Sequence, residues 1–476
     1  MPLPTFARCS GSTAALAGLL LLSACAAPSR LPGPDLAGGA LNTSAERLIL
    51  VTIANRPAPM VSEPGSTPHG YDVIGPYTVS AQARAITAEL ERDYDLREVR
   101  EWPIAPLGVQ CLVFALPPAA DRAELLRRLA ADRRVRLTQP LQLFDALGGN
   151  AGSTLDAAPA VNATQARAAT PTTFGTSSGS LGVSYNDPYI GLQHGFAAIE
   201  AGAAQQWSRG EGVNVAIVDT GVDVEHPDLA GRVALTHNFI DDDRQAFASD
   251  RHGTGVAGII GADANNNLGI VGVAPAARLQ IYKACQPTKP QSLEAQCNSF
   301  TLALALEAAI EAHAQIVNLS LGGPADPLLA QLISFGQHRG MIFVGAVPED
   351  GRLDGFPLGI PGVIAVDESG RPGASSAVLY APGRDIISLA PAGRYDFASG
   401  SSFAAAHVTG AIALLRARAP GLDAAGLFSV LERTRTHDEH GDCINVCAAL
   451  AALQPKYECT QPVRAVASAT ATATVH

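Results

Sequence analysis

The sequence has no basic tract, no long hydrophobic run and no internal repeat. Its 44 Asp and Glu outnumber its 33 Lys and Arg, giving a net charge of −11 and a pI near 5.5. Without a basic patch, nucleic acid is disfavoured as a partner. The apolar run near the N-terminus, GSTAALAGLLLL, is too short to span a bilayer comfortably. No period of about 20–50 residues is evident, which argues against a repeat architecture.

What the chain does contain is a globular composition. It has 476 residues, of which 47% are hydrophobic and 16% are charged, with 46 Gly and 33 Pro. Those values predict two to three domains with many turns and enough apolar side chains for a large core.

The N-terminus predicts export. Arg8 precedes the short apolar run, and the sequence Leu22-Ser23-Ala24-Cys25 follows it. LSAC resembles the lipobox of bacterial lipoproteins, which implies cleavage of a signal peptide, residues 1–24, and lipidation of Cys25. The protein would then be held by lipid in the bacterial cell envelope, or released after processing. An ordinary signal peptide cut nearby is the alternative, and it also implies export.

Eight cysteines fit an exported protein. Cys285 and Cys297 bracket the polar segment QPTKPQSLEAQ and form the predicted disulfide. Pairing within the C-terminal group is left open; that group is Cys443, Cys447 and Cys459. Cys111 has no obvious partner.

Residues 25–45 are rich in Pro, Gly and Ser and predict a tether, and residues 46–147 predict a small α+β unit. Its strand-like and helix-like runs follow the order β-α-β-β-α-β, which gives a ferredoxin-like fold. The second helix would begin at Asp121, and LTQPLQLFDAL could supply a last strand.

After residue 147 the composition and the pattern of apolar residues change. Residues 148–185 are rich in Gly, Ala, Ser and Thr and predict a flexible linker. In residues 186–455, apolar runs such as VNVAIVD, QIVNLSL and MIFVGAV alternate with helix-like segments, which indicates a parallel sheet with crossover helices. Residues 456–476 are of low complexity and predict a disordered tail.

Three short segments place reactive side chains in special settings. Asp219 ends the strand-like run VAIVD, His252 opens a run of small residues, and Ser402 starts a long apolar helix. Taken singly, each has a plainer explanation: a turn aspartate, a surface histidine and an N-cap serine. At a helix start, however, a serine also lies at the positive end of the helix dipole.

Together, in the order Asp, His, Ser, these segments resemble the subtilisin-like serine proteases. The resemblance extends to HPDL, NNNLGIVGVAP, NLSLGG and FPLGIPGVIAV. It implies that residues 186–455 form a parallel-sheet, three-layer α/β domain of the subtilisin type. The small α+β ferredoxin-like unit, residues 46–147, resembles the inhibitory propeptide domain of that family.

The resemblance implies a role for each residue. Ser402 would attack the peptide carbonyl, His252 would take its proton, and Asp219 would hold the imidazole. Ser320, Leu321 and Gly322 would supply an edge strand for an extended substrate.

One position departs from the family in a way that bears on activity. The family has a Gly-Asn dipeptide after the strand MIFVGAV, and its Asn donates to the oxyanion. Here Glu349 stands at the Asn position, or Asp350 if the register shifts locally. Loss of such a donor costs roughly 10²–10³ in rate. Glu349 could point away, for example toward Arg352, or burial could keep it protonated as a donor.

Milder departures flank the serine. Ala406 replaces a usual Pro, Phe403 a usual Met and Ser401 a usual Thr. The alanine removes a rigid feature of the helix start.

The resemblance also implies a calcium site with oxygen ligands only. Asp228 and Asn266 would give side-chain oxygens, and Ala264, Leu268 and Ile270 would give carbonyls. A hydrogen-bonded Asn/Gly loop without an ion is the alternative.

The leading interpretation is an exported, self-processing serine endopeptidase made as a zymogen, with its own propeptide as inhibitor and polypeptides as substrates. The alternative is a catalytically impaired, protease-like peptide-binding protein. A lipase or esterase that uses the same three residue types is disfavoured, because the sequence has no G-x-S-x-G motif around the candidate nucleophile Ser402. The processing site, the substrate preference, the membrane and the oligomeric state are left open.

Overall fold

The computed structural model describes residues 38–56, 78–148, 161–162, 184–371, 375–438, 441–454 and 456–457. The predicted signal peptide, Cys25 and Cys459 lie outside these residues, as do most of the predicted linker and tail. Within the described ranges, no helix combines the length and apolarity needed to cross a bilayer.

The N-terminal unit is built on a four-stranded antiparallel sheet with strand order β2-β3-β1-β4. Ser80 caps α1 by accepting the N–H of Ala83, and Asp121 caps α2 by accepting two N–H groups. The predicted β-α-β-β-α-β order is confirmed by β1 (Leu48–Ala54), α1 (Ala81–Tyr94), β2 (Arg97–Ile104), β3 (Val109–Ala115), α2 (Arg122–Ala130) and β4 (Val135–Pro140).

Both ends of this unit differ from the sequence-based expectation. Residues 38–45 were expected in a tether, but they lie in a 3-10 helix, Gly38–Arg47, that buries Leu41 and Ala45. The segment LTQPLQLFDAL does not form one strand. β4 ends at Pro140, and β5 (Leu143–Ala146) leaves the sheet to pair with β11 (Ala295–Asn298) and β13 (Leu321–Gly322).

A seven-stranded parallel sheet forms the centre of the C-terminal region, with strand order β16-β15-β14-β12-β7-β9-β8. The predicted parallel sheet is therefore confirmed. In chain order its strands are β7 (Asn214–Asp219), β8 (Val233–Asn238), β9 (Arg278–Lys283), β12 (Ile316–Leu319), β14 (Ile342–Ala346), β15 (Ile364–Glu368) and β16 (Val378–Ala381).

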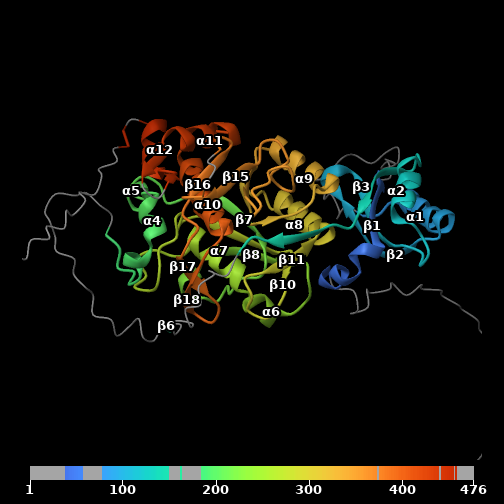
Figure 1. The fold of residues 1–476 in the computed structure, drawn as a ribbon, viewed down its shortest axis with the longest axis horizontal. Helices are drawn as coiled ribbons and strands as arrows, with labels where there is room; N and C mark the ends of the chain where they lie inside the picture. The colour runs from blue at the N-terminus through green and yellow to red at the C-terminus, as the bar shows by residue number, and fades with distance from the viewer. Residues whose placement is uncertain are drawn as a thin grey trace, which may run out of the picture. The chain divides into compact units, whose positions relative to one another are not determined.

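Alternation along β7 shows how helices cover both faces of this sheet (Figure 1). Val215 and Ile217 pack with α7 (Arg251–Gly261) and α10 (Ser401–Arg418). Ala216 and Val218 pack in a second cluster with α8 (Ser299–Glu311) and α9 (Pro327–His338). The two clusters make the three-layer arrangement that the sequence predicts.

Shorter elements surround this framework. They are η3 (Ala105–Leu107), β6 (Val161–Asn162), η4 (Ile190–Leu192), α4 (His194–Ala198), α5 (Ala201–Ala204), η5 (Pro227–Leu229), α6 (Arg244–Ala248), β10 (Cys285–Pro287), β17 (Ile386–Ala390), β18 (Arg394–Ala398), α11 (Ala424–Arg433), β19 (Thr436–Asp438), β20 (Gly441–Cys443) and α12 (Val446–Leu453).

The predicted disulfide between Cys285 and Cys297 is confirmed, and it joins directly paired residues of β10 and β11. Cys447 is also disulfide-bonded. Cys111 is a buried thiol in β3, and burial raises its pKa well above the usual value.

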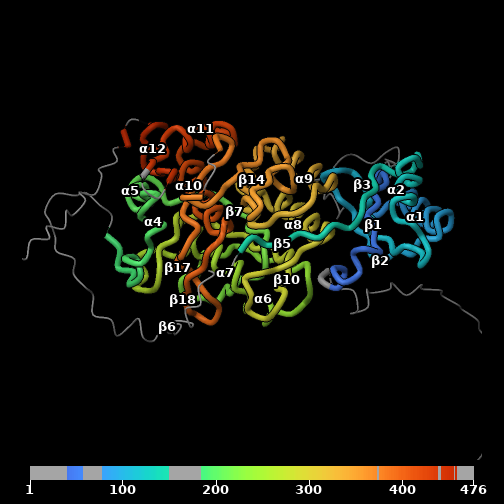
Figure 2. The backbone as a smooth tube through the Cα atoms, in the orientation of Figure 1, coloured from blue at the N-terminus to red at the C-terminus, as the bar shows by residue number. Residues whose placement is uncertain are grey.

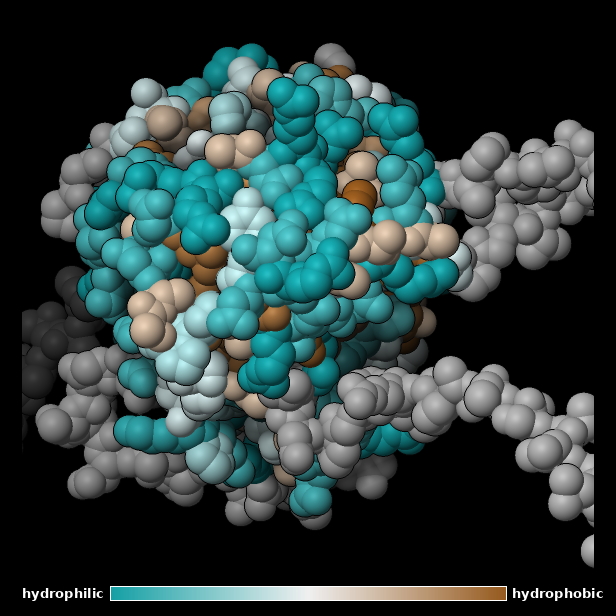
Figure 3. Space-filling model, turned by 90° about the vertical axis from the view of Figure 1, so that its right-hand side faces the viewer, coloured by the Kyte–Doolittle hydropathy of each residue, from teal (hydrophilic) through white to brown (hydrophobic). Residues whose placement is uncertain are grey.

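The face of the molecule in Figure 3 is mostly hydrophilic, and its hydrophobic residues are exposed singly or in small groups. That face therefore offers no broad apolar surface to a partner.

Candidate active site

The side chains of Asp219, His252 and Ser402 meet in one hydrogen-bonded row. His252 Nδ1 is 2.7 Å from Asp219 Oδ1, and His252 Nε2 is 3.0 Å from Ser402 Oγ. All three residues are at most 1% exposed. The imidazole can therefore exchange a proton with the hydroxyl while the carboxylate fixes its tautomer.

The row is assembled by the ends of three elements. Asp219 is the last residue of β7, and His252 and Ser402 are each the second residue of a helix, α7 and α10. Asp219 Oδ1 also accepts the N–H of Thr220, at 2.6 Å, whereas Oδ2 is buried without a hydrogen-bond partner. Carboxyl ends of parallel strands are where such groups gather in α/β folds.

Ser402 lies in the first turn of α10, where backbone N–H groups have no acceptor within the helix. Gly400 precedes the helix with φ of 141°, a conformation that favours glycine. Ser401 Oγ donates to the carbonyl of Val347 at 2.6 Å, tying the end of β14 to this turn. The helix starts here although Ala406 stands where the family usually has Pro.

A buried polar chain supports Ser402 from behind. Thr409 Oγ1 donates to Asn318 Oδ1 at 2.8 Å, Asn318 Nδ2 donates to Ser320 Oγ at 2.8 Å, and Ser320 Oγ donates to the carbonyl of Ser402 at 3.2 Å. The supporting roles of Asn318 and Thr409 were not predicted from the sequence. The polar Asn within the apolar run QIVNLSL was the available signal.

The edge strand predicted at residues 320–322 is occupied by a segment of this same chain, since β13 pairs with β5. β5 is labelled in Figure 2. In the antiparallel pairing of β5 with β13, Leu321 faces Ala146 and Gly322 faces Asp145. On its other side β5 pairs with β11. The N–H of Leu147 donates to the carbonyl of Ser320 at 3.0 Å, so the extended backbone reaches the residue that contacts Ser402.

Side chains of this segment fill hollows on the C-terminal region. Phe144 is fully buried and meets the ring of Phe356 edge to face, with centroids 5.2 Å apart. A Cβ on Gly323 would lie 2.5 Å from the Phe144 ring, so only glycine leaves room there. Leu147 packs beside Gly322. The next residue, Gly148, is buried against the imidazole of His252.

At the predicted oxyanion position the side chain of Glu349 is neither buried nor paired with Arg352. Glu349 is exposed, so the burial required to keep it protonated is not found. Arg352 pairs with Asp354 at 2.9 Å rather than with Glu349. The guanidinium of Arg371 instead bonds to the carbonyl oxygen of Glu349.

Two of the predicted calcium ligands, Asp228 and Asn266, are in contact, and Asp228 also bonds to the backbone of Ile270. Asp228 accepts from Asn266 Nδ2 at 2.7 Å and from the N–H of Ile270 at 2.9 Å. Burial raises the pKa of Asp228 to about 6, and the nearby Asp187 adds to the rise. Asp187 is itself 2% exposed and accepts the N–H of Asn265. Sequence analysis did not find Asp187 because it precedes the loop by many residues.

The loop is closed by its own hydrogen bonds, since Asn266 presents Nδ2 to Asp228 and its Oδ1 accepts the N–H of Leu268 at 2.8 Å. The two desolvated carboxylates have no cationic side chain among their hydrogen-bond partners in the described residues, and a divalent ion would compensate both. No group of three or more His, Cys, Asp or Glu side chains converges anywhere in the described ranges. A cation bound there would therefore depend on amide and carbonyl oxygens as well.

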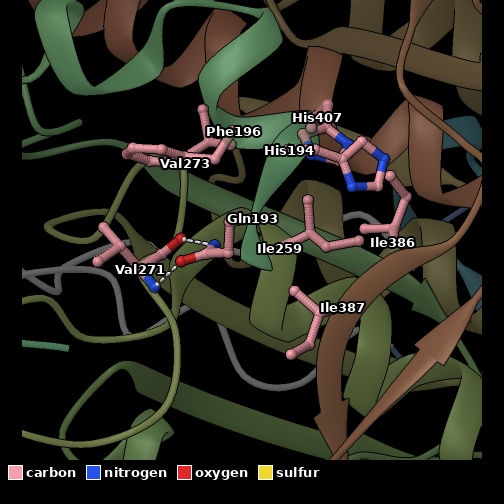
Figure 4. Close-up of a pocket in the computed structure, with 10 residues that line it drawn as sticks. Gln193, His194, Phe196, Ile259, Val271, Val273, Ile386, Ile387 and His407 are labelled. Atoms are coloured by element: carbon pink, nitrogen blue, oxygen red, sulfur yellow. Dashed lines mark hydrogen bonds between the residues drawn. The ribbon is translucent and has the colours of Figure 1, made fainter. Parts of the chain in front are cut away.

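A second buried histidine belongs to a separate place. His407 lies in a hollow together with Gln193, whose amide bonds to both backbone groups of Val271 (Figure 4). Burial lowers the pKa of His407 to about 4, and its Nδ1 bonds to the carbonyl of Phe403. The hollow measures only about 10 Å³, which leaves space for one water at most. His407 is therefore a structural residue.

Comparisons with known proteins identify the family of this chain. The family described as "Subtilase family" matches residues 210–445. The chain is 33% identical over 260 residues to thermitase from Thermoactinomyces vulgaris, covering 52% of this chain and 90% of thermitase. It is 36% identical over 244 residues to an intracellular serine protease from Paenibacillus polymyxa, covering 47% and 73% of the two chains.

A solved structure extends the likeness. Fervidolysin from Fervidobacterium pennivorans, described as a keratinolytic enzyme related to subtilisin, superimposes with a TM-score of 0.59. The match covers 85% of this chain and 60% of fervidolysin at 21% identity, so it concerns the fold alone.

Proposed function

The chain belongs to the subtilase family of serine peptidases, and we propose that it is an endopeptidase made as a zymogen that cuts its own chain after Leu147. Residues 46–147 are its inhibitory propeptide in this proposal, and residues 148–185 become the N-terminal arm of the processed enzyme.

The chemistry follows from the row of three side chains. His252 takes the proton of Ser402 as the hydroxyl attacks the peptide carbonyl, and returns it to the leaving amine. Asp219 holds the imidazole tautomer and stabilises the imidazolium. The backbone N–H of Ser402, in the first turn of α10, faces the developing negative charge.

A single observation carries the proposal: the chain's own strand β5, Leu143–Ala146, pairs with β13 and leads through Leu147 to Gly148 at the imidazole. The hydrogen bond from Leu147 to Ser320 and the contact of Gly148 with His252 support the Leu147–Gly148 peptide bond as the one that is cut. Main-chain pairing gives affinity with broad sequence tolerance, and the buried Phe144 and packed Leu147 add side-chain selection.

Self-processing tests this function. Residues 26–476 should yield a fragment beginning at Gly148, identified by mass and N-terminal sequencing, and Ser402→Ala should stay intact. Leu147→Pro should also stay intact, because proline has no N–H for the bond to Ser320. A Ser402-dependent cut elsewhere would overturn the assigned bond, and an intact, folded parent chain would overturn the endopeptidase.

One observation favours a second candidate function. Glu349 offers no amide donor to an oxyanion, and its ionised carboxylate would repel one. A protein with the same cleft and peptide pairing but little turnover would bind extended peptides instead. This alternative would be selected if the parent bound peptides without cutting them and if no substitution at position 349 restored cleavage.

Two further features complete the proposal. Lipidation of Cys25 anchors the zymogen in the cell envelope, and a cut after Leu147 separates the peptidase from that anchor. The resident cation is Ca²⁺, held by Asp228 and Asn266 with the carbonyls of Ala264, Leu268 and Ile270, and it stabilises the loop rather than the reacting atoms.

A further inference from the structure

A buried ion pair lies directly behind the Asp219–His252 couple. Lys283 Nζ is 2.7 Å from Asp250 Oδ2, and the two side chains are only 2% and 4% exposed. Lys283 ends β9 in register with Asp219 at the end of β7, and Asp250 is the residue before α7. The pair thus joins the strand end that carries the acid to the helix start that carries the imidazole.

The carboxylate of Asp250 also holds the turn that follows Asp219. It accepts the N–H of Gly221 at 2.7 Å, and Gly253 in α7 donates to Thr220 Oγ1 at 2.9 Å. Turn and helix approach so closely that a Cβ on Gly253 would lie 2.6 Å from the carbonyl oxygen of Gly221. A shift of Asp250 would therefore shift Asp219 relative to His252.

The charges interact at short range because water is excluded. Burial raises the pKa of Asp250, the Lys283 ammonium opposes this rise, and the Asp219 carboxylate adds to it. Removal of either partner would leave an uncompensated charge next to the imidazole, with little solvent screening.

We propose that Asp250 and Lys283 are positioning residues that lock the Asp219 turn onto α7 and balance the charge around His252. This inference rests on the proposed role of His252 as general base. Neither side chain contacts the reacting atoms.

Other charged groups near His252 come from several elements. Asp219 accepts from the imidazole itself. Arg251, beside it in α7, pairs with the exposed Asp396 of β18 at 2.7 Å. Asp223, after β7, accepts the N–H of Ala392. Within this set Lys283 is the buried cation. Its removal should therefore change the charge balance around the His252 imidazole more than removal of the exposed groups.

The two single substitutions should move the imidazole in opposite directions. Asp250→Asn keeps an acceptor for Gly221 and leaves the ammonium unbalanced, which disfavours the imidazolium. The acid limb of kcat/KM should then move down by about 1 pH unit. Lys283→Gln keeps a donor for Asp250 and leaves the carboxylate unbalanced, so the acid limb should move up. The double variant should return close to the parent.

The experiment compares the pH dependence of kcat/KM for processed parent, both single variants and the double variant on one peptide. Glu432→Gln is the control, because it removes a charge from a surface pair with Arg435, at 2.6 Å, and should not move the limb. Shifts in the same direction in both single variants, or an unmoved limb in Asp250→Asn, would overturn the proposal.

Two provisions keep the outcome decisive. If Lys283→Gln does not fold, Asp250→Asn decides alone, since a merely loosened site would not extend activity to lower pH. If the parent shows no Ser402-dependent cleavage, the proposed function fails by itself. The two variants are then compared by NMR titration of His252 in Ser402→Ala chains, which needs no turnover. The titration should move down in Asp250→Asn and up in Lys283→Gln, and the absence of these opposite shifts would overturn the charge balance.

Discussion

Gly148 lies against His252 so closely that a Cβ built on this glycine would be 2.3 Å from the imidazole Cδ2. The ring has little freedom to move aside, because both of its nitrogens are hydrogen-bonded. A residue one position past the proposed cut is therefore in direct contact with the proposed general base.

A side chain at position 148 should slow self-processing. We expect Gly148→Val to lower the rate of cleavage roughly tenfold or more, because the imidazole or the peptide must shift. The rate is measured by mass spectrometry over time. Gly191→Ala is the matched control, since no atom outside the neighbouring residues lies within 4 Å of a Cβ there. Equal rates for Gly148→Val and the parent would contradict the contact.

An amide at position 349 should raise activity. Glu349→Asn would supply the missing donor and remove a negative charge near the oxyanion, so we expect kcat to rise roughly tenfold or more with little change in KM. Asp350→Asn is the control for register. If Asp350→Asn alone increased kcat, the donor position would be 350, and if neither did, the site would use another source of stabilisation.

Loss of the Cys285–Cys297 disulfide should weaken substrate binding more than chemistry. The bond secures β11, a strand that pairs with β5. We expect Cys285→Ser/Cys297→Ser to raise KM several-fold for extended peptides while kcat changes little. A reductant should have no further effect on KM in this variant. A fall in kcat at unchanged KM would show that β11 acts on the catalytic groups instead.

The contact between Glu307 and Ala105 of the N-terminal unit should make the stability of the chain depend on pH. Glu307 accepts the N–H of Ala105 at 2.9 Å, and burial raises its pKa from 4.5 to about 7, with nearby Glu311 adding to the rise. The folded state binds the Glu307 proton more tightly than the unfolded state does. The contribution of protonated Glu307 to the free energy of unfolding therefore falls as pH rises from about 4.5 to about 7.

Glu307→Gln in the Ser402→Ala chain should therefore flatten the decline in the thermal midpoint between about pH 5 and pH 8. Glu311→Gln, which removes the smaller influence, should flatten it less. An unchanged slope in Glu307→Gln would mean that another group carries the pH dependence.

Removal of calcium should destabilise the processed enzyme. Binding of an ion to the folded state alone raises stability by mass action, so a chelator should lower the thermal midpoint by about 5 °C or more. Added Ca²⁺ should restore it. Asp228→Asn and Asp187→Asn should each reduce this response, and a full response in both variants would place the ion elsewhere.

Much of the architecture could be predicted because it is written in local patterns. Apolar runs identified the strands of the parallel sheet, and their spacing indicated crossover helices. Asp121 marked the start of α2, and the spacing of Cys285 and Cys297 indicated their disulfide. The subtilase family was predicted from motifs and is confirmed by the match over residues 210–445.

Other features could not be predicted because they depend on contacts between distant residues. Asp187 joins Asp228 only through folding, and the ion pair of Asp250 with Lys283 links β9 to α7. The sequence alone does not decide whether Glu349 is buried or exposed. Its exposure depends on the path that the chain takes after β14.

The sequence by itself determined the family, the order of the elements and the residue types at the site, because these follow from local periodicity and short motifs. Tertiary structure alone decided that β4 ends at Pro140 and that residues 143–148 leave the N-terminal sheet for the cleft. The physical reason is that β5 could pair either with the N-terminal sheet or with β11 and β13. Which of these it pairs with depends on the backbone groups and side-chain contacts that the rest of the fold brings within reach.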